Sequence, residues 1–129
     1  MTDEYLALGK RAADCKHWRF TPGMRVQYPD GAALRIQDMA EVVAFFGVRA
    51  VGRALAGALP DISDAATVGC LLQLVRDAWG GHAQVCDPEM STMEDGTDWM
   101  VLTCRKGGVG SFFGVTEAEA LVVALEAAP

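Results

Sequence analysis

The side chains best suited to chemistry in this 129-residue sequence are two histidines, four cysteines and one glycine-rich basic segment. His17 and His82 each follow a predicted helix, where an imidazolium near the negative end of the helix dipole is mildly stabilising without any catalytic role. The sequence contains no G-x-S-x-G elbow, no zinc-deaminase signature and no Walker phosphate loop. We therefore expect no enzyme activity, no catalytic residue and no cofactor.

The four cysteines are far apart and include no C-x-x-C pair, which favours reduced thiols in a chain without a secretion signal. We expect Cys15, Cys86 and Cys104 to lie on apolar faces or strands as small hydrophobic residues, and Cys70 beside a buried stripe. A zinc site at His82, Cys86 and Cys104 would need a fourth ligand that the spacing does not supply. No metal site is predicted.

A glycine-rich turn with two cations is the nearest approach to a phosphate cradle. It lies between two predicted strands rather than before a helix, so a plain hairpin turn is the competing interpretation. Two further arginines, four residues apart, would form an anion-binding pair if their segment is helical, and are otherwise solvated charges. The candidate anion-binding residues are Arg105, Lys106, Gly107, Gly108, Arg49 and Arg53.

Acidic residues are concentrated in the second half of the chain. The net charge is −6, with +2 over residues 1–60 and −8 over residues 61–129. This distribution argues against direct contact with nucleic acid, which needs clustered lysine and arginine, and suits a partner protein with a basic surface. The candidate partner-binding residues are Asp87, Glu89, Glu94, Asp95 and Asp98, for which a solvated loop is the alternative.

The clearest structural signal is a helix between Asp64, a suitable N-cap, and Gly80 or Gly81, which can end it. Spacings of three and four residues predict one buried face, made of Val68, Leu71, Leu72, Val75, Ala78 and Trp79. Three polar residues fall away from that face and are expected to stay solvated: Gln73, Arg76 and Asp77.

Other patterns predict a helix over residues 3–17, a hairpin of 24–28 and 33–37, and strands at 83–86, 98–105 and 110–114. A capping box of Thr116 and Glu119 begins a last helix. Residues 38–58 fit more than one structure, with a helix over 39–46 slightly favoured. We therefore predict a single α+β domain over residues 1–129, with helices packed on one antiparallel sheet.

No apolar run reaches the roughly 18 residues that a membrane-spanning helix needs, and the N-terminus is acidic. We expect no membrane contact, no secretion signal and a cytoplasmic location.

Three parts of the sequence, residues 7–24, 59–71 and 117–128, resemble a group of small uncharacterised phage and prophage proteins. The matching motifs include Ala7-Leu8-Gly9-Lys10-Arg11-Ala12-Ala13, Cys15-Lys16-His17-Trp18-Arg19-Phe20 and Leu59-Pro60-Asp61-Ile62-Ser63-Asp64. More broadly, the chain is similar to the phage ABA sandwich domain. The resemblance implies a phage origin and α-β-α layering. It implies no catalytic residue, because the group has no established activity.

These observations favour a phage accessory protein that acts by non-catalytic binding in the host bacterial cytoplasm. Its acidic surface would inhibit a host component, for instance one of antiviral defence, that presents a basic surface. Two alternatives stay open: a protein that sequesters a small ligand or nucleotide with Lys106 and the glycine turn, and a minor virion or assembly protein. The sequence leaves the oligomeric state open.

Overall fold

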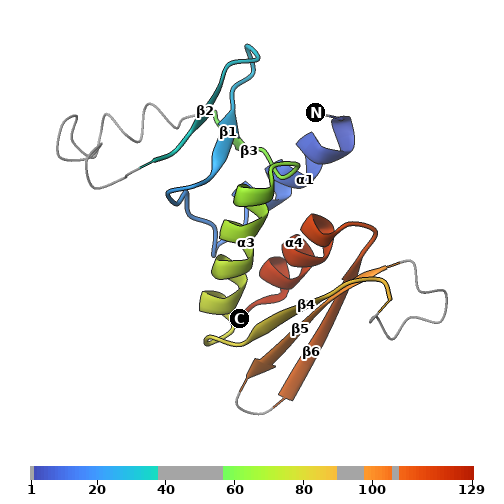
Figure 1. Cartoon of the computed structure of the whole chain (residues 1–129). Coiled ribbons are helices and arrows are strands. Elements are labelled where there is room, and N and C mark those ends of the chain that lie inside the picture. The colour runs from blue at the N-terminus through green and yellow to red at the C-terminus, as the bar shows by residue number, and fades with distance from the viewer. Residues whose placement is uncertain (1, 38–56, 90–97, 106–107) are drawn as a thin grey trace.

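A computed structural model describes residues 2–37, 57–89, 98–105 and 108–129. The helices are α1 (Asp3–Ala13), α3 (Ala65–Ala78) and α4 (Glu117–Ala127). The strands are β1 (Arg25–Gln27), β2 (Ala33–Arg35), β3 (Leu59–Pro60), β4 (Ala83–Cys86), β5 (Trp99–Arg105) and β6 (Gly108–Gly114) (Figure 1). The predicted α+β class is confirmed. The helix predicted over residues 39–46 lies outside the described residues.

The strands form two small antiparallel sheets rather than the single sheet that we predicted. The first has the order β2-β1-β3 and the second β4-β5-β6. The short strand β3 was not predicted. It pairs with the free side of β1 and leads directly into α3, whereas β4 begins just after α3 ends. The two sheets therefore lie at opposite ends of α3 (Figure 1). This helix has 14 residues and is roughly 21 Å long.

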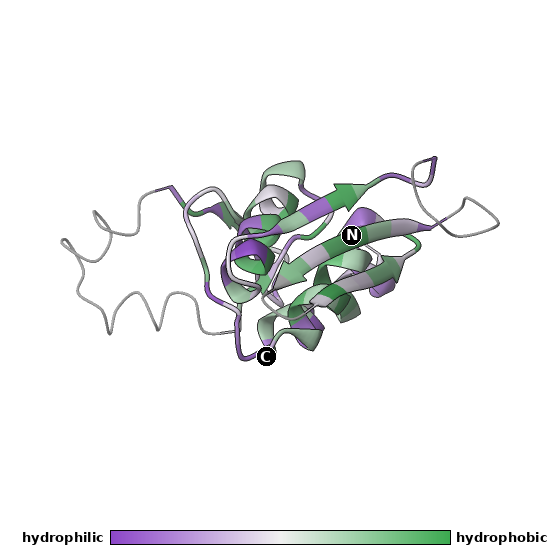
Figure 2. Ribbon diagram, turned by 90° about the horizontal axis from the view of Figure 1, so that it is seen from below, coloured by the Kyte–Doolittle hydropathy of each residue, from purple (hydrophilic) through white to green (hydrophobic). Residues whose placement is uncertain are grey.

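The described helices lie on one side of the second sheet. α4 contacts β5 and β6, α3 contacts α4 and β4, and α1 contacts α4 and β3. In the view from below, the strands of the second sheet lie in front of the helices (Figure 2). Within the described residues no helix covers the other face of this sheet, so the α-β-α layering is not confirmed. None of the described helices is both long and apolar enough to span a bilayer.

The buried face of α3 is displaced from the one predicted. The buried residues are Thr67, Leu71, Leu74 and Val75, whereas Val68 and Leu72 are only partly buried. Periodicity alone identified an apolar stripe, but α3 contacts both α4 and β4, and its N-terminus meets the first sheet at Thr67. Packing on several sides moves the buried face towards Leu74.

One carboxylate joins the first sheet to the start of α3. Asp64 is the N-cap and accepts hydrogen bonds from the backbone N–H and the hydroxyl of Thr67, at 3.0 and 2.9 Å. It also accepts two bonds from the Arg35 guanidinium of β2, at 2.8 and 2.7 Å. The Thr67 hydroxyl oxygen in turn accepts from the backbone N–H of Arg25 in β1, at 2.8 Å. We call these four residues the Asp64 network.

A second carboxylate, Asp61, supports the same junction from a buried position, with 2% of its surface exposed. It accepts hydrogen bonds from the backbone and hydroxyl of Ser63 and from the side chains of Arg25 and Gln27. Since a buried carboxylate is costly unless it is well hydrogen-bonded, these donors are what allow Asp61 to lie between β1 and α3.

The displaced face of α3 predicts an order of stability for two substitutions of the same type. Leu74→Ala should cost about 2–5 kcal/mol of unfolding free energy, because Leu74 is 1% exposed and its removal leaves a cavity. Leu72→Ala, at a partly buried position, should cost clearly less. Chemical denaturation of both variants measures the difference, and an equal or reversed order would place the buried face where the periodicity put it.

The Asp64 network predicts a pH dependence of stability. The hydrogen bonds from Arg35, followed by those from Thr67, lower the pKa of Asp64 below its usual value of about 3.9. The carboxylate therefore contributes stability above that pH, and the contribution is lost as the pH falls below it. Asp64→Asn keeps an acceptor for the cap but does not titrate. The stability gap between wild type and this variant should shrink from pH 7 to pH 3, and a gap independent of pH would contradict this role.

Candidate functional site

Antiparallel pairing of β4 and β5 brings three of the predicted acidic residues to one end of the second sheet. Asp87 and Glu89 follow the end of β4 and are exposed, and Asp98 precedes the start of β5 and is half-buried. We call these three residues the acidic end. The other two candidates, Glu94 and Asp95, lie outside the described residues.

The basic segment forms a hairpin connection rather than a helix N-terminus. Arg105 ends β5, Gly108 begins β6, and these two residues pair with each other in the antiparallel register. The other anion-binding candidates, Lys106, Gly107, Arg49 and Arg53, lie outside the described residues. The turn and the acidic end are at opposite ends of β5, which is seven residues or roughly 20 Å long.

Two glycines of β6 have packing roles. A Cβ atom at Gly110 would lie 2.7 Å from the Thr103 hydroxyl and 2.9 Å from the Phe112 ring. At Gly114 it would lie 2.5 Å from the backbone nitrogen of Ala120 in α4. These glycines allow β6 to lie close to its neighbours, which is a structural reason for their presence that needs no bound phosphate.

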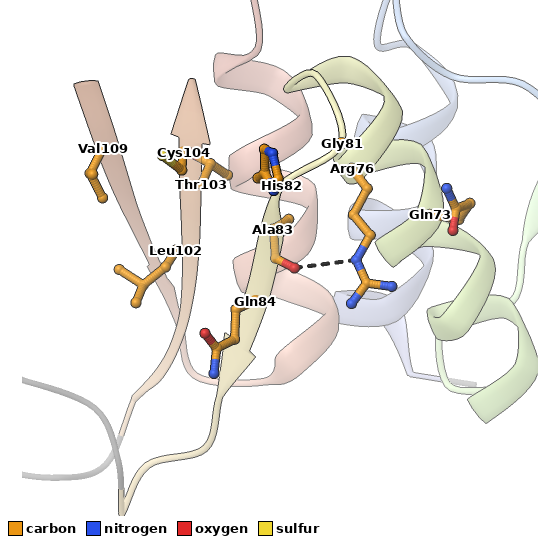
Figure 3. A pocket seen from close by; sticks show the side chains of 10 residues that line it. All are labelled: Gln73, Arg76, Gly81, His82, Ala83, Gln84, Leu102, Thr103, Cys104 and Val109. Carbon is orange, nitrogen blue, oxygen red and sulfur yellow. Dashed lines mark hydrogen bonds between the residues drawn. The ribbon is translucent and has the colours of Figure 1, made fainter. Parts of the chain in front are cut away.

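A shallow groove of about 730 Å³ runs along β4, one of the two edge strands of the second sheet. Leu102 and Val109 lie on one side of β4, and Arg76 and Gln73 lie on the other (Figure 3). The groove therefore follows the strand's edge instead of forming an enclosed pocket.

Arg76 occupies part of that edge. Its Nε donates a hydrogen bond to the backbone oxygen of Ala83, at 3.2 Å (Figure 3). The backbone N–H of Cys104 donates to His82, so by antiparallel alternation Ala83 and Val85 direct their backbone groups away from β5. Arg76 was predicted to be solvated, but it is half-buried and satisfies one of these outward carbonyls. Its spacing on α3 gave no sign of this contact, which depends on where β4 returns.

His82 and Cys104 face each other at the end of β4 and β5, and both are exposed. The exposure of Cys104 corrects our prediction, because alternation along β5 turns it to the face that no described helix covers. Cys86, by contrast, is buried and pairs with Met100, four residues farther along β4 than His82. The three suggested zinc ligands therefore do not converge. Across the described ranges, no group of three or more His, Cys, Asp or Glu side chains could hold a metal ion.

His17 has a different environment from the one expected. Helix α1 ends at Ala13, with Asp14 as its C-cap, so the helix terminates before the predicted residue 17. The Nε2 atom of His17 lies 2.8 Å from the backbone oxygen of Pro129 and makes a hydrogen bond with it. This histidine links the region after α1 to the end of the chain.

Comparisons with protein-family models, curated proteins and solved structures give no match for this chain. The resemblance to phage proteins and to the ABA sandwich domain therefore stays a prediction from sequence motifs.

The positions of the cysteines predict an order of chemical reactivity. A thiol reagent should modify the native protein fastest at the exposed Cys104, and should reach the buried Cys86 only after unfolding. Mass spectrometry of briefly labelled protein identifies the site. Cys104→Ser should remove the fast phase, and a fast phase that persists in this variant would show that another thiol is the accessible one.

Proposed function

We propose that this chain is a phage accessory protein that inhibits a host antiviral defence component by binding to it without catalysis. The acidic end would contact a basic surface on that component, in the bacterial cytoplasm. The convergence of Asp87, Glu89 and Asp98 at one end of the second sheet is the observation that carries this proposal. The resemblance to phage proteins supports the proposed origin.

The distribution of ion pairs supports the same interpretation. Each of the four ion pairs of the described residues joins an arginine of the first half to a carboxylate of the second: Arg11–Glu126, Arg19–Asp77, Arg25–Asp61 and Arg35–Asp64. The basic side chains of the first half thus hold the fold together, and the carboxylates that they bind, Asp61, Asp64, Asp77 and Glu126, lie outside the acidic end.

The electrostatics of the pairs agree with a structural role for them. Hydrogen bonds from the Gln73 amide and from the Arg19 guanidinium lower the pKa of Asp77. A hydrogen bond to Glu126 raises the pKa of Arg11. In both cases the contacts favour the charged form, so these groups stay ionised at neutral pH.

An acidic surface of this kind would act on a partner in two ways. It would attract a basic protein over a distance of about the Debye length, which raises the rate of encounter. It would then occupy a surface that otherwise holds nucleic acid, because both present closely spaced negative charges. The same charge disfavours direct binding of nucleic acid by this chain.

The acidic end predicts a salt-dependent association rate. The test uses the partner captured from a host lysate by the tagged protein and then purified. Asp87→Asn, Glu89→Gln and Asp98→Asn together should slow association more than they speed dissociation, because exposed charges mainly steer encounter. A biosensor at low and high salt measures both rates, and the rate difference from wild type should vanish at high salt.

The matched control neutralises three carboxylates elsewhere: Glu4→Gln, Asp14→Asn and Glu117→Gln. It changes the net charge equally and should leave the association rate nearer to that of wild type. Wild-type association by the acidic-end variant at low salt would reject the proposal. Loss of binding on Arg105→Ala and Lys106→Ala alone would instead favour ligand sequestration at the turn.

A further inference from the structure

The last strand of the second sheet, β6, has an open edge. The strand order is β4-β5-β6, so β6 is hydrogen-bonded on one side only. Among the described elements none lies beyond β6 on its other side (Figure 1). At seven residues β6 is as long as the central strand β5, whereas the opposite edge strand β4 has four residues. A long open edge is a template for pairing with another chain.

The register shows which backbone groups of β6 are available. The backbone N–H of Cys104 donates to His82, so Arg105 and Thr103 direct their backbone groups to Gly108 and Gly110, and the hydrogen-bonded pairs to β5 fall on every second residue from Gly108 onwards. The residues between them, Val109, Ser111 and Phe113, direct their N–H and C=O groups away from β5. These outward groups are therefore free of bonds to β5, whose own backbone groups alternate between β4, as at Cys104, and β6, as at Thr103 and Arg105.

Nothing in the sequence of β6 protects this edge. Edge strands are normally shielded by lysine, by proline or by a covering side chain. Residues 108–114 contain no charged residue and no proline. On β4, by contrast, Arg76 covers an outward carbonyl. Val109, the second residue of β6, is 70% exposed.

We propose that a second copy of this chain binds along β6, with the two β6 strands antiparallel about a two-fold axis at Ser111. Ser111 would then face Ser111 of the other copy, and Val109 would face Phe113. All three outward residues would form hydrogen-bonded pairs in this register. The second sheet of one copy and the second sheet of the other would then form one continuous sheet.

Three features select a second copy as the occupant of this edge. A β-branched residue opposite an aromatic one is a favourable cross-strand pair, and the two-fold axis repeats the Val109–Phe113 pair on both sides of Ser111. On the other face of the strand, Phe112 would face Gly110, which has no side chain to obstruct it. No like charges oppose each other, since residues 108–114 are uncharged.

A further feature is charge complementarity at the two ends of the joint sheet. Antiparallel pairing places Arg105, the last residue of β5 in one copy, on the side where Asp98 precedes β5 in the other. Arg105 and Lys106 are among the few cations of the second half of the chain, and the acidic end belongs to the same half. The arrangement thus brings the end of β5 that carries Arg105 in each copy towards the acidic end of the other.

Analytical ultracentrifugation over a concentration series tests the proposal. Wild type should show a monomer–dimer equilibrium, and Val109→Lys should raise the dimer dissociation constant at least ~10-fold by placing a charge opposite Phe113. Ser111→Pro should do the same, because it removes an outward N–H and no bond to β5. Leu34→Lys, at an exposed leucine of the first sheet, is the matched control and should leave the dimer intact. A monomeric wild type, or a dimer insensitive to both β6 variants, would overturn the proposal.

Cross-linking tests the register independently of stability. In a Cys104→Ser background, Ser111→Cys should form a disulfide between copies under mild oxidation, because hydrogen-bonded partners have Cα atoms about 5.5 Å apart. Val109→Cys should not, since its two copies would lie four residues apart along the strand, roughly 13 Å. Equal cross-linking of the two variants would rule out the two-fold axis at Ser111.

Discussion

The Asp64 carboxylate is the interaction on which the arrangement of the two sheets depends. It caps α3, binds Arg35 of β2 at both oxygens and orients the Thr67 hydroxyl, whose oxygen accepts from the backbone of Arg25 in β1. A cap alone satisfies the free N–H groups of one helix. This one also positions a sheet, because its acceptor is shared between the first turn of α3 and the β1–β2 hairpin. The direction of α3 in turn sets where β4 and the second sheet begin.

Local chemistry predicted the elements of the fold well. The cap at Asp64, the hairpin of β1 and β2 and the N-cap at Thr116 all appear where the sequence placed them. Contacts between distant segments were not predictable in this way. β3 has only two residues and becomes a strand because β1 lies beside it, so no periodicity could identify it. Its pairing adds a third strand to the first sheet, which has no strand in common with the second.

In the candidate site, too, some features follow from local sequence and others depend on contacts between distant segments. Convergence of Asp87, Glu89 and Asp98 follows from two adjacent antiparallel strands, so a sequence that predicts both strands also predicts the acidic end. The contact of Arg76 with β4 and the exposure of Cys104 depend on which edge and which face stay uncovered. Those properties belong to the assembled sheet. They also leave two surfaces with different characters, a charged end suited to steering a partner and a neutral strand edge suited to backbone pairing.

Native-state hydrogen exchange of Thr67→Val tests the central claim, that the Asp64 network holds the first sheet to α3. Valine keeps the shape of the buried side chain but removes the oxygen that accepts from Arg25. The account predicts faster exchange at the amides of Arg25 and Ile36, with unchanged protection across β5 and β6. Equal acceleration in both sheets, or none in the first, would contradict it.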